Sequence, residues 1–215
     1  MFAEFAASFA RLALTGLCRL WTGARLRWTG CLPETVPRLY FANHSSHLDG
    51  LFIWTSLPPE LRKRTSLVAA GDYWLRTAPR RWLVEQVFRV IPVERKGMRK
   101  DDCGKRRHPL EKLAAALHRG ESLIFFPEGT RHVGEEMLPF KSGLYHLAKM
   151  CPEAELVPVY LNNFYRVLPK GSRLMVPILC TAVVGAPLRL EQHETRREFL
   201  ERMKGELERL KAGET

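Results

Sequence analysis

Long uncharged stretches are missing from this sequence of 215 residues. The longest one runs from residue 174 to residue 188 and is interrupted by two prolines and a glycine. A helix that crosses a bilayer needs about 20 consecutive, largely apolar residues. We therefore expect no membrane-spanning helix, and any membrane contact is predicted to be peripheral.

Cysteine is also scarce, with five residues and no C-x-x-C pair. An odd number of widely spaced cysteines does not build a disulfide framework or a structural zinc site. The pattern indicates a reducing compartment.

Acidic residues are fewer than basic ones, 23 against 34, which gives a net charge of +11. Residues 61–107 alone hold 14 Lys and Arg against 5 Asp and Glu, a net charge of +9. Such a segment suits nucleic acid, an anionic membrane surface or a phosphorylated substrate. A solvated basic face is the alternative, but most of these charges are arginines, and Trp74, Trp82 and Phe88 lie among them.

Repeats, low-complexity tracts and linkers are absent, and 46% of the residues are hydrophobic, so we expect one domain with a substantial core. Short apolar runs alternate with helical periodicity. This alternation predicts an α/β fold, a single domain with a mostly parallel central sheet flanked by helices. The expected strands are 39–42, 65–70, 89–93, 122–126, 155–161 and 174–184. Two of the expected helices begin at residues 48 and 109, and two others span 73–88 and 191–211.

The first 31 residues form a separate segment. Their polar residues at positions 4, 8, 11, 15 and 19 share one stripe of a helix, and the apolar residues lie elsewhere on it. We predict an amphipathic helix over residues 1–31 that lies in a membrane interface, followed by the folded domain over 32–215. Docking of this helix on the protein's own core is the alternative.

Polar residues collect where the strand 39–42 ends and the next helix begins. His44 and Asp49 are separated by four residues, and their side chains can meet if His44 lies in the turn and Asp49 in the first helical turn. A carboxylate then holds one imidazole nitrogen, and the other nitrogen can take a proton from a hydroxyl. The plainer interpretation is that Asn43, Ser45 or Ser46 caps a helix and the histidines are surface residues.

Two other strands are followed by charged residues, Glu94 and Arg95 after one and Glu128 and Arg131 after the other. The carboxyl ends of parallel strands share one edge, so we expect these loops and His44 to converge on one cleft. Arginine forks suit a phosphate, and Gly129 allows close backbone approach. Taken alone, the loop with Glu128 and Arg131 is more simply interpreted as an ordinary loop with a surface Glu–Arg pair.

Two other chemistries are disfavoured. Ser45 or Ser46 could be acylated, but no G-x-S-x-G elbow is present, and Ser46 is better explained as a cap or as support for the turn. His44, His47 and Asp49 lack the H-E-x-x-H spacing and a third clear ligand, so no metal site is expected.

Together these motifs resemble a known family. N-H-S-S-H-L-D, I-P-V-E-R, F-F-P-E-G-T-R and V-P-V-Y follow one another across residues 43–160. Their order is that of the PlsC-like 1-acylglycerol-3-phosphate acyltransferases, within the glycerolipid acyltransferase family. Residue 132 departs from the pattern, because His132 stands where that family commonly has serine, and Glu94 stands where aspartate is common.

The resemblance implies transfer of a fatty acyl group from acyl-CoA or acyl carrier protein to a lysophospholipid, most simply lysophosphatidic acid, without a cofactor. It implies that His44 is the general base and Asp49 its partner, with Asn43 and Ser46 in support. The acceptor and its phosphate would be held by the residues Arg95, Glu128, Gly129, Thr130 and Arg131.

The implied location is peripheral, on the cytoplasmic face of the membrane, which is the inner membrane in a bacterium, and no nucleic-acid partner is expected. The departures flank the headgroup site, so another lysophospholipid or a lyso-aminolipid remains an alternative acceptor. A non-catalytic basic module that binds anionic membrane or nucleic acid is the third hypothesis.

Overall fold

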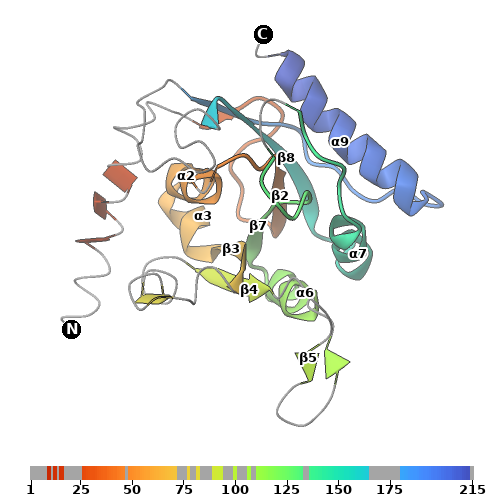
Figure 1. The fold of residues 1–215 in the computed structure, drawn as a ribbon, viewed down its shortest axis with the longest axis horizontal. Coiled ribbons are helices and arrows are strands. Elements are labelled where there is room, and N and C mark those ends of the chain that lie inside the picture. The colour runs from red at the N-terminus through yellow and green to blue at the C-terminus, as the bar shows by residue number, and fades with distance from the viewer. Residues whose placement is uncertain are drawn as a thin grey trace.

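The computed structural model describes residues 9–10, 12–13, 15–16, 26–46, 48–71, 77, 81–82, 89–93, 99–100, 106–107, 110–132, 136–164 and 180–213. Its centre is a seven-stranded sheet in the order β1-β9-β8-β2-β7-β3-β4 (Figure 1). The strands are β1 (Leu26–Trp28), β2 (Arg38–Ala42), β3 (Thr65–Ala70), β4 (Val90–Val93), β7 (Ser122–Phe125), β8 (Glu155–Asn162) and β9 (Thr181–Val184).

All neighbouring strands of this sheet are parallel except β8 and β9. The central strand β2 is buried along its whole length and pairs with β7 on one side and β8 on the other. A strand covered on both faces reads as a continuous apolar run, as residues 39–42 do. The predicted single domain with a mostly parallel sheet is confirmed.

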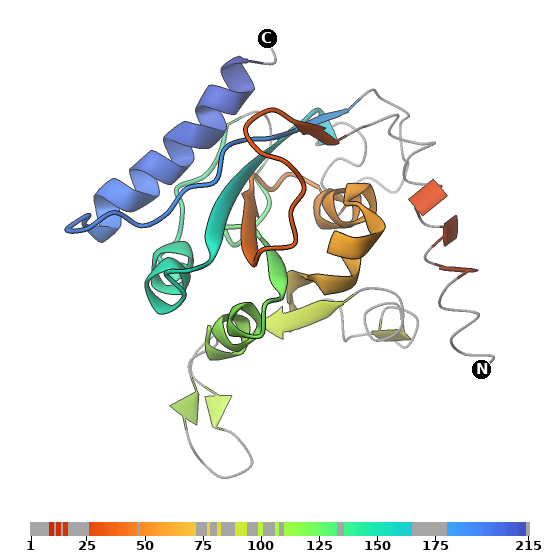
Figure 2. The same cartoon turned by 180° about the vertical axis from the view of Figure 1, so that it is seen from behind.

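Helices cover both faces of the sheet (Figures 1 and 2). On one face, α2 (Asp49–Ser56) and α3 (Pro59–Arg64) bury Phe52, Ile53 and Leu61 against Tyr40 and its neighbours. On the other face, α6 (Glu111–His118), α7 (Gly143–Met150) and α9 (Arg196–Ala212) pack over the remaining strand side chains. Successive residues of a strand point to opposite faces, so β2 contributes to both cores.

Several predicted elements are found with shifted bounds. The helix predicted from residue 109 is α6, and Gly120 follows it with φ +78°, a backbone conformation that suits glycine after a helix. The helix predicted over 191–211 is α9, which begins later because Thr195 and Glu198 form a capping box at its start. The helix predicted over 73–88 and the first part of the strand predicted over 174–184 fall largely outside the described residues.

The structure describes part of the predicted N-terminal segment. The described residues between 9 and 16 are helical, and most of the segment 1–31 lies outside the described residues. The structure adds that Leu26–Trp28 forms β1 and pairs with β9. Within the described residues, no helix is long and apolar enough to cross a bilayer.

A small antiparallel hairpin stands apart from the central sheet. It consists of β5 (Arg99–Lys100) and β6 (Arg106–Arg107), and it projects beyond α6 in both views (Figures 1 and 2). The hairpin belongs to the basic segment noted in the sequence.

Candidate active site

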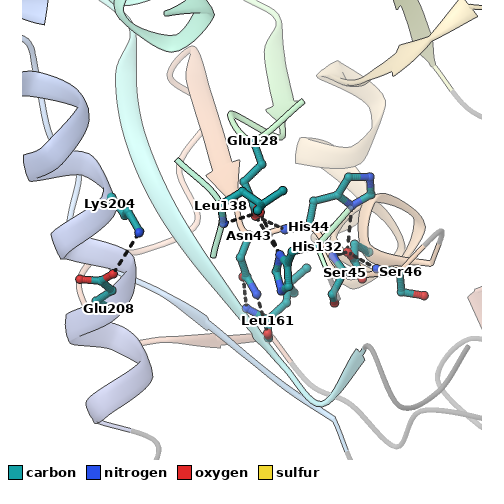
Figure 3. Close-up of polar contacts among 11 residues, drawn as sticks. Asn43, His44, Ser45, Ser46, Glu128, His132, Leu138, Leu161, Lys204 and Glu208 are labelled. Atoms are coloured by element: carbon teal, nitrogen blue, oxygen red, sulfur yellow. Dashed lines mark hydrogen bonds and ion pairs between the residues drawn. The ribbon is translucent and has the colours of Figure 1, made fainter. Parts of the chain in front are cut away.

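The polar side chains gather where β2, β7 and β8 end. These three strands are adjacent and parallel, so their carboxyl ends lie at one edge of the sheet. The loop after β2 carries His44, the loop after β7 carries Glu128, and β8 reaches the same edge at Leu161 (Figure 3). Segments far apart in the sequence therefore build one site, as is usual at the carboxyl ends of parallel strands.

His44 and Asp49 are in direct contact. The distance from His44 Nδ1 to Asp49 Oδ2 is 2.9 Å, with His44 in the turn and Asp49 at the first position of α2. The same oxygen accepts the backbone N–H groups of Ser45 at 2.7 Å and Ser46 at 2.8 Å. Asp49 is completely buried, and these three donors satisfy its Oδ2, whereas its Oδ1 has no hydrogen-bond partner among the described residues.

The remaining ring atoms of His44 face a different environment. The imidazole stacks on the Phe126 ring, with a centroid distance of 4.2 Å and an angle of 22°. Its side chain is 20% exposed, whereas Asp49 is 0% exposed, so a substrate can reach the ring but not the carboxylate. A nitrogen that donates to a carboxylate must carry the proton, which leaves Nε2 with a lone pair to accept one.

Asn43 and Ser46 support the turn. The Asn43 amide donates to the Leu161 carbonyl at 2.9 Å and accepts the Leu161 N–H at 2.8 Å, which ties the end of β2 to β8. Ser46 Oγ accepts the N–H of Leu48 at 3.3 Å. Among the described residues no side chain caps α2, so the plainer interpretation is wrong in making Asn43, Ser45 or Ser46 a helix cap.

Glu128 is buried rather than open to a ligand. Its Oε1 accepts the backbone N–H of His44 at 2.8 Å, and its Oε2 accepts the N–H of Leu138 at 2.9 Å. The His132 Nδ1 lies 2.9 Å from Oε2 and 3.2 Å from Oε1. Because protein donors occupy both oxygens, Glu128 is neither half of a surface Glu–Arg pair nor an open contact for an acceptor.

His132 was noticed in the sequence only as a departure from a family pattern. It is 5% exposed, and besides its ring contact its backbone N–H donates to the His44 carbonyl at 2.9 Å. Only the fold brings this residue to His44, because 88 positions separate the two in the chain.

The turn at Gly129 brings a second residue that the sequence did not indicate. Gly129 has φ +66°, and a Cβ built there would lie 2.9 Å from Lys141 Nζ and 3.0 Å from Lys141 Cδ. The lysine side chain therefore lies across the glycine, and its backbone N–H donates to the Pro127 carbonyl at 2.9 Å. The P-F-K-S-G sequence carries no spacing signal that would have linked Lys141 to this turn.

Thr130 and Arg131 follow the same turn. Thr130 is exposed and Arg131 is half-buried. In the part of the chain that the structure describes, no carboxylate pairs with the Arg131 guanidinium, so it is available to an anion. Glu94, Arg95 and His47 lie outside the described residues.

The cysteines of the described chain do not add a nucleophile to this site. Cys31, Cys151 and Cys180 form no disulfide within the described residues. Burial raises the pKa of the Cys31 and Cys151 thiols, which disfavours the reactive thiolate at neutral pH. The group best placed to react is thus the His44 imidazole.

Comparison with known proteins points to one family. The family model described as Acyltransferase matches residues 26–162. A mouse 1-acyl-sn-glycerol-3-phosphate acyltransferase alpha is 29% identical over 164 residues, which cover 74% of this chain and 52% of that protein. The lyso-ornithine lipid O-acyltransferase of Brucella abortus is 30% identical over 130 residues, covering 59% of this chain and 42% of that protein.

A solved structure shares the fold. The 1-acyl-sn-glycerophosphate acyltransferase PlsC from Thermotoga maritima aligns with a TM-score of 0.69 and 18% sequence identity, over 96% of this chain and 80% of that chain. The chain spans about half the length of the curated relatives that it matches.

Proposed function

This chain belongs to the acyltransferase family, and we propose that it transfers a fatty acyl group from a thioester to the free hydroxyl of a lysophospholipid. Acyl-CoA or acyl carrier protein would supply the acyl group. Lysophosphatidic acid, which would give phosphatidic acid, is the acceptor that we favour, because the mouse relative is named for that substrate class.

One observation carries the proposal, namely the contact between His44 and Asp49 at the carboxyl ends of the parallel strands. Asp49 is buried and holds Nδ1 at 2.9 Å, while the imidazole is partly exposed. A base of this kind contributes about 10² to 10⁴-fold to a proton-transfer step. A thioester is already activated, so no covalent enzyme intermediate is required.

The reaction then follows in one displacement. His44 Nε2 takes the proton of the acceptor hydroxyl as its oxygen attacks the thioester carbonyl carbon. The carbon–sulfur bond breaks, and the imidazolium returns the proton to the departing thiolate, which leaves as a thiol. Asp49 keeps the proton on Nδ1 throughout and stabilises the imidazolium that forms.

The acceptor phosphate would be bound by the turn after β7. Arg131 offers a planar fork, and we assign it and Arg95 to the phosphate, with Gly129 and Thr130 giving close approach of the backbone. Lys141 lies over Gly129 and adds a positive charge to the same turn. Glu128 is not assigned to the phosphate, because its oxygens already accept hydrogen bonds from the His44 and Leu138 N–H groups.

Membrane association is supported by the N-terminal helix. Phe9 and Leu12 are 69% and 73% exposed, whereas Thr15, from the predicted polar stripe, is buried and accepts a hydrogen bond from Arg62 at 3.3 Å. Thr15 thus faces the protein while the apolar Phe9 and Leu12 face outward, which supports an interfacial role for this helix. We infer a peripheral protein on the cytoplasmic face of the membrane.

A second acceptor class is favoured by one comparison. The Brucella relative is named as a lyso-ornithine lipid acyltransferase, and this acceptor has no phosphate. The test is a panel of lysophosphatidate, glycerol 3-phosphate and a lyso-ornithine lipid, each supplied with acyl-CoA and with acyl carrier protein. We expect the highest kcat/KM with lysophosphatidate. If only the lyso-ornithine lipid were acylated, the acceptor would be that lipid and not lysophosphatidate. If no acceptor were acylated, the proposed function would be refuted.

A further inference from the structure

The described site contains a ring of hydrogen bonds around His44 that the proposed reaction does not use. It runs from the His44 N–H to Glu128 Oε1, from Glu128 to the His132 ring, and from the His132 N–H back to the His44 carbonyl (Figure 3). Each of its three protein-to-protein links is between 2.8 and 2.9 Å long. The main-chain N–H and the main-chain carbonyl of His44 are therefore both fixed by residues of the loop after β7.

The side chains that form this ring of hydrogen bonds are buried, so the loss of any one bond would leave a polar group without a partner. The side chains of Glu128 and His132 are 0% and 3% exposed. A carboxylate removed from water needs donors for its lone pairs, and leaving one of them without a donor is unfavourable. Two of its donors are backbone N–H groups, and His132 is the single side-chain donor among the described residues.

The histidine also reaches the carboxylate with a defined nitrogen. His132 Nδ1 must carry the hydrogen to donate, and it does so both as the neutral Nδ1–H tautomer and as the imidazolium. The bond to Glu128 is thus available in either protonation state.

We propose that His132 is a positioning residue for the base. It orients the Glu128 carboxylate, Glu128 and the His132 N–H hold the His44 main chain, and Asp49 then holds the His44 ring. This inference rests on the proposed acyl transfer, because the purpose of the arrangement is to keep Nε2 within reach of the acceptor hydroxyl. A displacement of about 1 Å at a reacting group can cost on the order of 10²-fold in rate.

The test compares His132→Leu with His132→Asn. Leucine and asparagine have the same branched shape, but the asparagine Nδ2 can donate from nearly the position of Nδ1. We expect His132→Leu to lower kcat about 10- to 100-fold, with KM for donor and acceptor changed less than about 3-fold. His132→Asn should recover most of kcat. His118→Leu, on α6 beside Cys151, is the matched control and should keep the wild-type kcat.

A second readout does not depend on activity. Amide hydrogen exchange at residue 44 should become faster in His132→Leu and return toward the wild-type rate in His132→Asn, while exchange in α9 stays unchanged. If the wild-type protein transfers no acyl group to any acceptor, the proposed function fails. The exchange rate at residue 44 then still tests whether His132 holds the His44 main chain in place.

Other results would overturn the proposal. Equal kcat values for His132→Leu and the wild type, or equal losses in the leucine and asparagine variants, would show that the donor does not position His44. Should the leucine variant not fold, His132→Phe keeps a ring of similar shape without the donor. If both donorless variants fail to fold while His132→Asn folds, His132 is needed for folding and not for positioning.

Discussion

His44 is held by contacts to its ring and to its main chain, and this explains how a residue in a loop can act as a base. Asp49 binds its ring, Glu128 binds its N–H, and Phe126 stacks against its imidazole. Replacing His44 by alanine should reduce kcat at least 10²-fold, because no other described side chain can take the hydroxyl proton. The variant should still fold, because Asp49 Oδ2 keeps the N–H donors of Ser45 and Ser46. A folded His44→Ala protein with near wild-type turnover would refute the mechanism.

The Arg131 guanidinium tests phosphate recognition separately from charge. Arg131→Lys keeps the charge but loses the planar fork, and a lost charge-assisted hydrogen bond is worth about 1.5 to 3 kcal/mol. We expect kcat/KM for lysophosphatidate to fall roughly 10- to 150-fold. Arg119→Lys, an exposed arginine paired with Glu121, is the control and should change nothing. An equal loss toward an acceptor without phosphate would contradict the phosphate contact.

Residue chemistry could be predicted where the residues are close in sequence. The spacing of His44 and Asp49 was enough to predict a contact once a strand-to-helix turn was expected. The Glu128 environment could not be predicted, because its donors come from residue 44, residue 132 and residue 138. A glutamate beside an arginine suggests a surface or ligand contact, and only burial shows that this one binds the backbone of the protein itself.

Among the elements, α9 shows what periodicity can and cannot predict. Its apolar stripe of Phe199, Met203 and Leu207 packs on the sheet, as the sequence suggests. Its start depends on capping by Thr195, so the helix is shorter at that end than the charge pattern indicates. The direction of β9 was not predictable either, because an apolar run carries no sign of whether its strand runs parallel or antiparallel to β8.

The start of α9 also carries an ion pair with a clear pH dependence. Glu194 accepts two hydrogen bonds of 2.7 Å from Arg202, and this lowers the pKa of the Glu194 carboxyl below its ordinary 4.5. A lowered carboxyl pKa stabilises the fold above the unfolded-state value, and the contribution disappears as pH falls through the lowered value.

Glu194→Gln should therefore lower the free energy of unfolding at pH 7 by about 1 kcal/mol. The difference from the wild type should shrink as the pH falls below 4.5 and vanish below the lowered pKa. Denaturant unfolding across this range measures it. Glu201→Gln, which removes an exposed pair with Arg197, should show no change at any pH. A difference that persists at low pH would mean that packing, and not the charge pair, is responsible.

At the scale of the whole molecule, the sheet brings the chemistry to one edge and the N-terminal helix supplies an apolar surface beside α3. Composition predicted one domain, because 46% hydrophobic residues suffice for the two cores observed, whereas the alternation of apolar runs with helical periodicity predicted the α/β fold. Composition could not show which side of the first helix faces the protein. The contact between Thr15 and Arg62 decides this for the described residues.

That orientation leads to a prediction about membrane binding. Phe9→Ser combined with Leu12→Ser should weaken binding to vesicles that contain anionic phosphatidylglycerol by about 10-fold or more, because burying each side chain in lipid is worth about 1.5 to 3 kcal/mol. Melting temperature should change little, since both side chains are exposed. Leu32→Ser is the matched control, because Leu32 is 71% exposed and lies in the loop before β2, at the sheet edge opposite His44. A vesicle sedimentation assay compares the variants. Lower stability with unchanged vesicle binding would instead mean that the helix packs on the protein's own core.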